Sequence, residues 1–372
     1  MKQNNNLQAF FALLRAGLWE KEVRLLPYGE ISFSEIQQLA EEQSIIGLIS
    51  AGLEYVIDVK VQKKDVLQFI GQTIQLEQKN LAMNYFIGVL VDKMRKEGIY
   101  TILVKGQGVA QCYERPLWRS CGDVDFFLSD ENYNKAKIYL SPLASNIEEE
   151  YVRERHLGMT IDPWVVELHG SLYSGLSSRV EKCLDEVYQD TFFHGSVRSW
   201  QNDMVQVFML SVENDAFYVF THILQHFYKG GIGLRQICDW CRLLWTYRDS
   251  IDAEKIEGRL QRSGLKMAWK TFAAFAVDYL GMPAEAMPFY SPDRKWKRKA
   301  GKISSFVMKV GNFGRNRDHS YFEKYPYLIR KVYSFGRRCG DLLRHARIFP
   351  WDSLRFFPRI VYNGLRSAAR GE

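Results

Sequence analysis

The sequence lacks the long apolar run that a membrane-spanning helix requires. No stretch of the 372 residues contains about 18 consecutive apolar residues without a charge. The longest apolar segment, residues 267–282, is interrupted by Lys270 and Asp278. Another apolar run begins at Leu7 and ends at Arg15, which predicts an amphipathic helix rather than a signal peptide. The sequence therefore predicts a protein without a transmembrane segment.

Proline and cysteine are also sparse. The chain has 10 prolines and 27 glycines, which excludes collagen-like and disordered classes. Its six cysteines show no paired spacing of the kind found in small disulfide-rich secreted proteins, so we expect reduced thiols in a cytoplasmic protein. Hydrophobic residues make up 47% of the chain, enough to bury the cores of two or three domains.

The net charge of +7 is distributed unevenly along the chain. Residues 291–372 contain 20 Lys and Arg but 6 Asp and Glu, whereas the first 290 residues contain 30 basic and 37 acidic residues. Basic and aromatic residues alternate in this C-terminal quarter, which suits a polyanion such as nucleic acid or an anionic membrane surface. The same pattern also suits docking onto the acidic remainder of the chain.

Residues 1–97 are predicted to form an N-terminal helical region. Ser32 and Glu35 have the spacing of a capping box at the start of one helix. A longer helix is expected over residues 63–96, ending at Gly98. Its predicted apolar face consists of Val66, Phe69, Ile70, Ile74, Leu81 and Tyr85.

Residues 98–176 have the pattern of a compact α/β unit. Strands are predicted over residues 99–104, 123–128, 151–161 and 164–169, where short apolar or alternating runs are bounded by turn residues. Short helices are expected near residues 109–113 and over 131–140, the second capped by Asp130.

The rest of the chain is predicted to be helical. A helical domain is expected over residues 177–290, with helices near residues 204–228 and 233–247, and a basic helical region over residues 291–372. The predicted fold class is therefore α+β, with a small mixed β-sheet and its helices flanked by helical regions at both ends.

Asp123 and Asp125 are the most informative residues of the predicted core. Positions i and i+2 of a strand point to the same side, so both carboxylates project together. Two close negative charges favour a divalent cation between them, and hard oxygen ligands favour Mg²⁺ or Mn²⁺. The alternative is an edge strand that carries two solvated aspartates.

The residues around this pair strengthen the metal interpretation. The first strand ends at Lys105 and Gly106, where the N-terminal amides of the next helix could receive phosphate oxygens. Glu167 lies on a later strand, on the same face as Val165 and His169, and adds a third carboxylate. Together these features predict a metal-dependent phosphoryl-transfer site.

Three motifs resemble a known family. Val104-Lys-Gly-Gln-Gly108, Arg119-Ser-Cys-Gly-Asp-Val-Asp-Phe-Phe-Leu128 and Val166-Glu-Leu-His169 are similar to the uncharacterised nucleotidyltransferase family of the DNA polymerase beta-like superfamily. The superfamily pattern is a Gly-Gly or Gly-Ser turn, then Asp-x-Asp or Asp-x-Glu, then a third acidic residue on a later strand. Here the turn reads Gly106-Gln107.

The resemblance implies a role for each matching residue. Asp123 and Asp125 would bind magnesium, and Glu167 would be a third ligand or the base that accepts the acceptor's proton. Gly106 and Gln107 would lie against the triphosphate, and Lys105 and Arg119 would neutralise phosphate charge. Other interpretations are a solvated strand end for Lys105 and an ion pair with Asp123 for Arg119.

The function that this resemblance implies is Mg²⁺-dependent transfer of a nucleoside monophosphate from an NTP to an acceptor hydroxyl. The acceptor could be a small molecule, a sugar, a protein or an RNA end. A different class of function is a catalytically inactive, nucleotide-binding regulatory protein with the same fold. A third is a role at a membrane surface through the basic quarter, so the expected location is the cytoplasm, with or without peripheral membrane contact.

Two further patterns lie in the predicted helical domain. His222 and His226 have a zinc-compatible i, i+4 spacing, but no glutamate stands beside either, so we interpret them as polar groups facing the cleft. In proteins that resemble this one, such histidines are followed by an Arg and an Asp, here Arg235 and Asp239. Cys238-Asp-Trp-Cys241 lies in a helical pattern, which favours two partly buried thiols over a redox motif.

Overall fold

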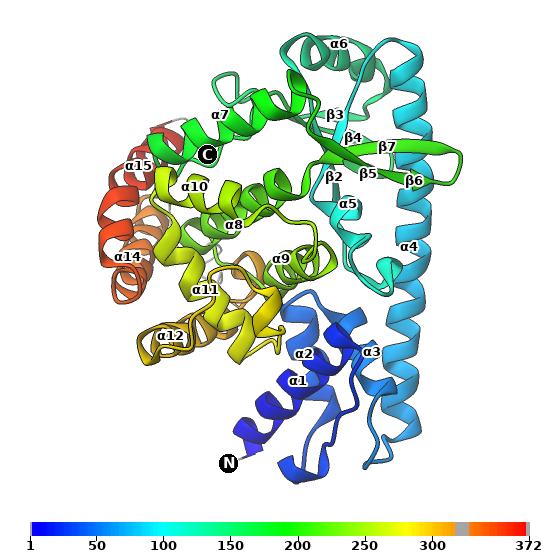
Figure 1. Cartoon of the computed structure of the whole chain (residues 1–372), viewed down its shortest axis with the longest axis vertical. Coiled ribbons are helices and arrows are strands. Elements are labelled where there is room, and N and C mark those ends of the chain that lie inside the picture. The colour runs from blue at the N-terminus through cyan, green and yellow to red at the C-terminus, as the bar shows by residue number, and fades with distance from the viewer. Residues whose placement is uncertain (1, 317–326, 370–372) are drawn as a thin grey trace.

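The structure is a computed structural model that describes residues 2–316 and 327–369. Within these residues it contains fourteen α-helices and a seven-stranded mixed sheet, so the predicted mixed fold with helical regions at both ends is confirmed. Figure 1 shows the N-terminal helices at the bottom, the sheet at the upper right and the C-terminal helices along the left edge.

The N-terminal region forms helices α1 (Lys2–Trp19), α2 (Phe33–Glu42), α3 (Ile46–Glu54) and α4 (Lys63–Lys96). Ser32 caps α2 as predicted, because its hydroxyl accepts a hydrogen bond from the backbone N–H of Glu35. The 34 residues of α4 extend over about 50 Å along one side of the molecule (Figure 1). This helix connects the N-terminal helices to the sheet.

The exposed and buried sides of α4 differ from the prediction. Phe69 is buried, but Ile70, Ile74, Leu81 and Tyr85 are 46–77% exposed. The buried side instead includes the polar residues Thr73 and Asn80, together with Met83, Ile87, Leu90, Val91 and Met94. An apolar pattern could not identify this face, because two polar side chains that make buried hydrogen bonds lie on it.

The sheet contains β1 (Ile102–Val104), β2 (Asp123–Phe127), β3 (Asn146–Ile147), β4 (His156–Ile161), β5 (Trp164–His169), β6 (Val197–Asn202) and β7 (Val205–Leu210). Its strand order is β3-β4-β5-β2-β1-β7-β6. The β2–β5 and β1–β7 pairs are parallel, and the other neighbours are antiparallel. Strand β2 thus lies at the centre, beside β5, which carries Glu167.

The β6–β7 hairpin corrects the prediction of a helix from residue 204. Residues 205–210 pair with β6 and β1, and the following helix, α8 (Val212–Lys229), starts only after Ser211. The hairpin turns at Asp203-Met204, where Asp203 has a φ of 53°, a conformation that Asn and Asp adopt more readily than other residues. The division of the chain at residues 97, 176 and 290 stays a prediction, although the sheet continues beyond residue 176.

Short helices join the strands of the core. Helix α5 (Gly106–Ala110) follows β1, α6 (Asp130–Leu140) follows β2, and α7 (Ser178–Phe192) precedes the hairpin. The residue that caps α6 is Ser129 rather than Asp130, since its hydroxyl accepts a hydrogen bond from the backbone N–H of Asn132.

The two faces of the sheet are covered by different helices. On β2, Val124, Phe126 and Leu128 belong to the core cluster that also contains buried residues of α4 and α6. Phe127 belongs to the other cluster, which contains buried residues of α7, α8 and α9 (Leu234–Thr246). Because side chains alternate along a strand, Asp123 and Asp125 share the second face, toward α8.

The basic C-terminal quarter docks mainly through apolar contacts. After α10 (Ala253–Ser263) and α11 (Lys266–Asp278) come α12 (Arg294–Val310), α14 (Tyr327–Ala346) and α15 (Pro350–Ala369). Trp296, Ile303 and Phe306 of α12 are buried in the same core as α8 and α11. No helix in the described ranges has both the length and the apolar composition needed to cross a bilayer.

Candidate functional site

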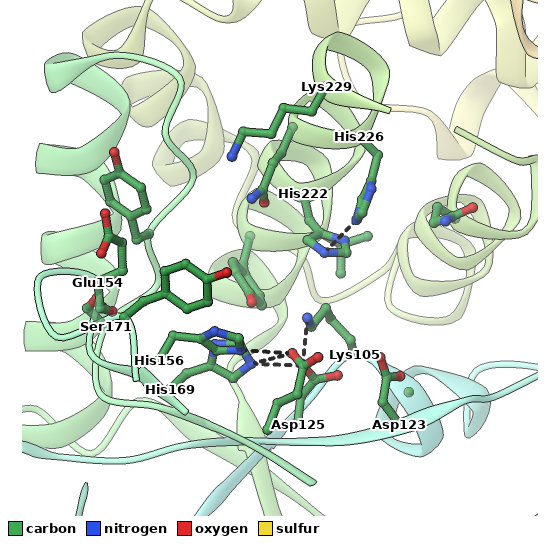
Figure 2. Close-up of a pocket in the computed structure, with 18 of the residues that line it drawn as sticks. Lys105, Asp123, Asp125, Glu154, His156, His169, Ser171, His222, His226 and Lys229 are labelled. Atoms are coloured by element: carbon green, nitrogen blue, oxygen red, sulfur yellow. Dashed lines mark hydrogen bonds and ion pairs between the residues drawn. The ribbon is translucent and has the colours of Figure 1, made fainter. Parts of the chain in front are cut away.

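A cavity of about 600 Å³ lies between the sheet and helices α8 and α9. Strands β2 and β5 and the start of α5 provide one side of its lining, and α8 and α9 provide another. Residues 149–154, before β4, and Phe313, after α12, complete the lining. Figure 2 shows Asp123 and Asp125 pointing into this space from below, with His222, His226 and Lys229 above them.

The carboxylates of the site come from two neighbouring parallel strands. Asp125 on β2 lies directly opposite Glu167 on β5 in the register of the pair, and Asp123 lies opposite Val165. Asp123, Asp125 and Glu167 all line the cavity. The strands therefore bring the three predicted carboxylates to one site.

Asp125 already has two close neighbours at one of its oxygens. Lys105 Nζ lies 2.8 Å from Asp125 Oδ1, and His169 Nε2 lies 2.8 Å from the same oxygen. Burial would lower the pKa of Lys105, but the charge of Asp125 raises it well above its usual value. Lys105 is thus a mostly buried, charged residue paired with Asp125, with 16% of its side chain exposed, rather than a solvated strand end.

Two histidines surround Glu167. His156 on β4 pairs in register with His169 on β5, and their Nε2 atoms lie 3.2 and 3.4 Å from Glu167 Oε2. Burial would raise the pKa of Glu167, but these hydrogen bonds hold it well below its usual value. Burial would likewise lower the pKa of His169, but hydrogen bonds to Asp125 and Glu167 raise it. Sequence reasoning did not identify His156, because it is 11 residues before Glu167 on a separate strand.

Asp123 is the carboxylate of the three that lacks a partner. Its side chain makes no ion pair or hydrogen bond within the part of the chain that the structure describes. The charge of Asp125, and then burial, raise the pKa of Asp123 above its usual value. A partly buried carboxylate held next to the buried carboxylate of Asp125 fits a divalent cation bound to their oxygens, and the oxygen donors suit Mg²⁺ or Mn²⁺.

Gly106 and Gln107 occupy different surroundings. Gly106 lines the cavity with a φ of 41°, and a Cβ there would lie 3.3 Å from Cys121 Sγ, so a side chain would be strained. The Gln107 side chain is buried and donates a hydrogen bond to Asn80 on α4, 2.8 Å away. Any contact of Gln107 with a ligand in the cavity would have to come from its backbone.

Arg119 lines the cavity but is paired with Asp239 rather than with Asp123. Its Nε and Nη2 atoms lie 2.9 and 2.7 Å from the two carboxylate oxygens of Asp239, and both side chains are buried. Tyr113 also donates a hydrogen bond to Asp239 at 2.8 Å. The pair connects the loop before β2 to α9, and Asp239 already neutralises the charge of Arg119.

His222 and His226 face the cavity as predicted, and they contact each other. Their Nε2 atoms are 3.0 Å apart, so one imidazole donates a hydrogen bond to the other. Burial, and then the charge of Lys105, lower the pKa of His226 to about 3 and the pKa of His222 well below its usual value. Both rings are therefore neutral at neutral pH.

Arg153, Lys229 and Arg235 are the cations of the lining that have no carboxylate within ion-pair distance among the described residues, and Lys229 and Arg235 come from the helices above the carboxylates. Arg235 donates to the backbone oxygen of Ser120 at 2.8 Å, and its buried Nε has no hydrogen-bond partner. Lys229 donates to the backbone oxygen of Ser174 at 3.3 Å. Lys229 was missed by sequence reasoning, although it lies on the same helical face as His222 and His226.

The cysteines take no part in the site. All six are free, and Cys238 and Cys241 are buried within α9. Burial raises the pKa of both thiols above the usual value, which makes them unreactive. This agrees with the interpretation of the Cys-x-x-Cys motif as two buried thiols.

Comparison with known proteins assigns the family. The sequence model of a family described as an uncharacterised nucleotidyltransferase matches residues 29–281, and the chain belongs to this family. The matched range includes all seven strands and the cavity-lining residues of α8 and α9. The basic C-terminal quarter lies outside it.

One solved structure is similar to the chain at a low level. It is described as the crystal structure of an antigenic nucleotidyltransferase-like protein from Paracoccidioides brasiliensis, with 13% sequence identity and a TM-score of 0.32. The similarity covers 54% of this chain and 92% of the other. A TM-score this low assigns no function. No curated protein matches the chain.

Proposed function

We propose that this protein transfers a nucleoside monophosphate from an NTP to an acceptor hydroxyl, with a divalent cation bound by Asp123, Asp125 and Glu167. The observation that carries the proposal is the convergence of these three carboxylates on one cavity, with Asp123 left unpaired. Membership of a nucleotidyltransferase family supports the same reaction class.

In the proposed reaction, the acceptor oxygen forms a bond to the α-phosphorus while the bond from that phosphorus to the bridging oxygen of the β-phosphate breaks. Pyrophosphate leaves, and the hydroxyl proton passes to water at the mouth of the cavity. A bound divalent cation would neutralise charge on the phosphate oxygens. Glu167 lies directly opposite Asp125 in the β2–β5 pair and faces the same cavity, so we assign it as a cation ligand.

We assign the phosphate contacts to Arg235 and Lys229. Lys105 and Arg119 are held by Asp125 and Asp239, so much of their charge is already neutralised. Arg235 and Lys229 face the same cavity without a carboxylate partner. Charge-assisted hydrogen bonds to phosphate would occupy their free donors.

The Lys105–Asp125 pair favours an alternative function. An ammonium group 2.8 Å from Asp125 supplies a positive charge where a cation would otherwise be needed. A protein with this arrangement could bind a nucleotide without turning it over and act as a regulatory binder.

One experiment separates these functions. The purified protein is incubated with labelled NTPs, Mg²⁺ and cell extract, and both acceptor labelling and pyrophosphate release are measured. Asp123→Asn is the best test variant because Asp123 has no partner to lose, and Asp249→Asn at an exposed position is the matched control. We expect labelling by the unaltered protein and the control, and at least a hundredfold less by Asp123→Asn.

Equal labelling by Asp123→Asn would contradict the catalytic assignment. Mg²⁺-dependent NTP binding without pyrophosphate release, across extracts from several growth conditions, would favour the regulatory binder instead.

A further inference from the structure

The side chains of His156, Glu167 and His169 form a second set of potential metal ligands beside the aspartates. One ligand atom from each lies within 4.8 Å of the corresponding atoms of the other two. His156 and His169 are cross-strand neighbours, with ring centroids 4.7 Å apart. Figure 2 shows the two rings side by side, next to Asp125.

The donors in this set differ from those of a magnesium site. Mg²⁺ prefers carboxylates, carbonyls and water, whereas imidazole nitrogen favours zinc, ferrous iron and related ions. Two imidazoles and one carboxylate form the ligand set of many catalytic transition-metal sites. His156 and Glu167 are a quarter exposed, so an ion could reach the set from the cavity.

We infer that His156, Glu167 and His169 bind a divalent transition-metal ion, with Zn²⁺ as the probe. Asp125 lies 2.8 Å from His169 Nε2 and would lie next to this ion. The inference extends the proposed function by adding a cation site with a different metal preference, and its ligand Glu167 is shared with the proposed magnesium site. Asp123, on the far side of Asp125, is not part of the set.

The test measures metal binding without any substrate. Zn²⁺ and Mg²⁺ are titrated into metal-free protein by calorimetry, and Co²⁺ is titrated with detection of its visible absorption bands. The variants are His156→Ala and His169→Ala, and the control is His194→Ala, a histidine that is 70% exposed and distant in the chain. His156→Ala is the milder variant because the side chain is partly exposed.

We expect the unaltered protein and the control to bind one Zn²⁺ at least tenfold more tightly than Mg²⁺. His156→Ala and His169→Ala should each weaken Zn²⁺ and Co²⁺ binding at least tenfold, with no change in circular dichroism. Undiminished Zn²⁺ binding in both variants would overturn the inference. So would loss of Zn²⁺ binding on substitution of His222 or His226, because the ion would then belong to α8.

This outcome is independent of the nucleotidyltransferase assay. If the protein does not bind Zn²⁺ but labels an acceptor with Mg²⁺ alone, the transition-metal site is wrong and the proposed function stands. If Zn²⁺ binds through the histidines but no NTP is turned over, the proposed function fails and the metal site stands.

A separate observation concerns the exposed side of α4. Leu67, Ile70, Ile74, Leu81 and Tyr85 are 46–77% exposed and follow one line along the helix over about 27 Å. The charged residues between positions 67 and 85 are Glu77 and Lys79, and Glu77 accepts a hydrogen bond from Trp118. Depletion of charge and enrichment of large apolar residues are typical of interface cores.

These five exposed residues form an apolar stripe, which can pack against the same stripe of a second copy in an antiparallel orientation. If two α4 helices cross about a two-fold axis at position 76, Leu67 faces Tyr85 and Gly71 faces Leu81 of the other copy. A Cβ placed on Gly71 would meet nothing within 4 Å, so there is open space where the partner's leucine would pack. A two-fold interface requires that one surface patch match itself in this way.

We infer that a second copy of this chain packs on this stripe, with α4 antiparallel to α4. The test is the mass in solution by light scattering and sedimentation. Leu81→Glu should give monomers, and so should Gly71→Leu, which fills space that is open in the single chain and replaces a poor helix former. Gln68→Glu, exposed on α4 outside the stripe, is the control and should remain dimeric.

A monomeric unaltered protein would overturn this inference. A dimer that persists in both Leu81→Glu and Gly71→Leu would also overturn it, since the copies would then associate through another surface.

Discussion

Lys105 Nζ and Asp125 Oδ1 form an ion pair, 2.8 Å apart, in the lining of the cavity, where the Asp125 side chain is buried. Lys105 has a φ of 57°, so its backbone adopts an uncommon conformation at the point where β1 ends and α5 begins. The pair places a fixed positive charge beside the proposed cation ligands. A divalent cation bound by Asp125 would have to share this oxygen with the ammonium group or displace it.

This relationship predicts how Lys105→Met affects stability. Removing the ammonium group leaves the buried Asp125 carboxylate with the His169 contact alone, so we expect the free energy of unfolding to fall by about 3 kcal/mol in metal-free buffer. Mg²⁺ should raise the free energy of unfolding more in the variant than in the unaltered protein, because the freed Asp125 carboxylate can bind the ion. Chemical denaturation with and without Mg²⁺ measures both effects.

Lys64→Met, on the exposed N-terminal turn of α4, is the control and should change the free energy of unfolding by less than about 0.5 kcal/mol. A loss in Lys105→Met that Mg²⁺ does not reduce would show that Asp125 does not bind the ion.

Arg119 and Arg235 should respond differently to substitution. Arg119→Ala leaves Asp239 buried without its main partner, so we expect a loss of about 3–5 kcal/mol in the free energy of unfolding. Arg235→Ala removes a cation that has no carboxylate partner, so its main effect should be on ligand binding. We expect it to weaken NTP binding about tenfold or more.

Thermal unfolding measures the stability of the two variants, and equilibrium dialysis with labelled NTP measures their nucleotide binding. The exposed Arg298→Ala is the control. If Arg235→Ala binds NTP as tightly as the control does, the phosphates contact other residues.

Local sequence patterns were sufficient to predict much of the sheet. Alternation located β2 and β5 and placed Asp123 and Asp125 on one side of β2. That Glu167 lies beside Asp125 depends on the register of the β2–β5 pair, which the structure shows. The long helix α4 was also predicted within its observed bounds. The buried face of this helix was not, because Thr73 and Asn80 are buried with hydrogen-bond partners outside α4.

The partners of the site residues could not be predicted, since they depend on contacts between distant segments. Arg119 pairs with Asp239, 120 residues further along the chain, rather than with the nearby Asp123. His156 reaches Glu167 only because β4 and β5 pair in a particular register. Lys229 could have been identified from the helical spacing 222, 226 and 229, which places it on the histidine face of α8.

His226 makes stability depend on pH. Its folded-state pKa of about 3 is below the usual value of 6.5 because burial, and then the charge of Lys105, disfavour the protonated ring. The unfolded chain therefore binds a proton first as the pH falls. This titration leaves the free energy of unfolding unchanged above about pH 6.5. As the pH falls from 6.5 to about 3, the free energy of unfolding decreases progressively.

The measurement is the free energy of unfolding between pH 7.5 and 5, compared with His226→Gln. We expect the unaltered protein to lose about 2 kcal/mol more than the variant over this range. The exposed His194→Gln should follow the unaltered profile. A His226→Gln profile parallel to that of the unaltered protein would contradict the assigned cause.

The basic C-terminal quarter is expected to contact anionic lipid through α14 and α15. Lys295, Arg344 and Arg355 pair with acidic residues of the same segment rather than with the acidic body. Among the side chains of the two helices that the structure describes, exposed apolar ones are Ile329, Tyr333, Leu343, Trp351, Leu354 and Tyr362, whereas Asp341, His345, Asp352 and Ser353 are buried. An outer surface of aromatic, aliphatic and arginine side chains is typical of helices that lie at a membrane interface.

Flotation with vesicles tests this expectation at about 0.15 M salt. The protein should float with vesicles that contain phosphatidylglycerol and not with vesicles of phosphatidylcholine alone. Trp351→Glu should abolish most of this binding, because it places a charge where an apolar ring would enter the lipid. Met204→Glu, at the 88% exposed turn of the β6–β7 hairpin, is the matched control. Equal flotation of the two variants, or retention on RNA in place of vesicles, would show that α15 does not dock on lipid.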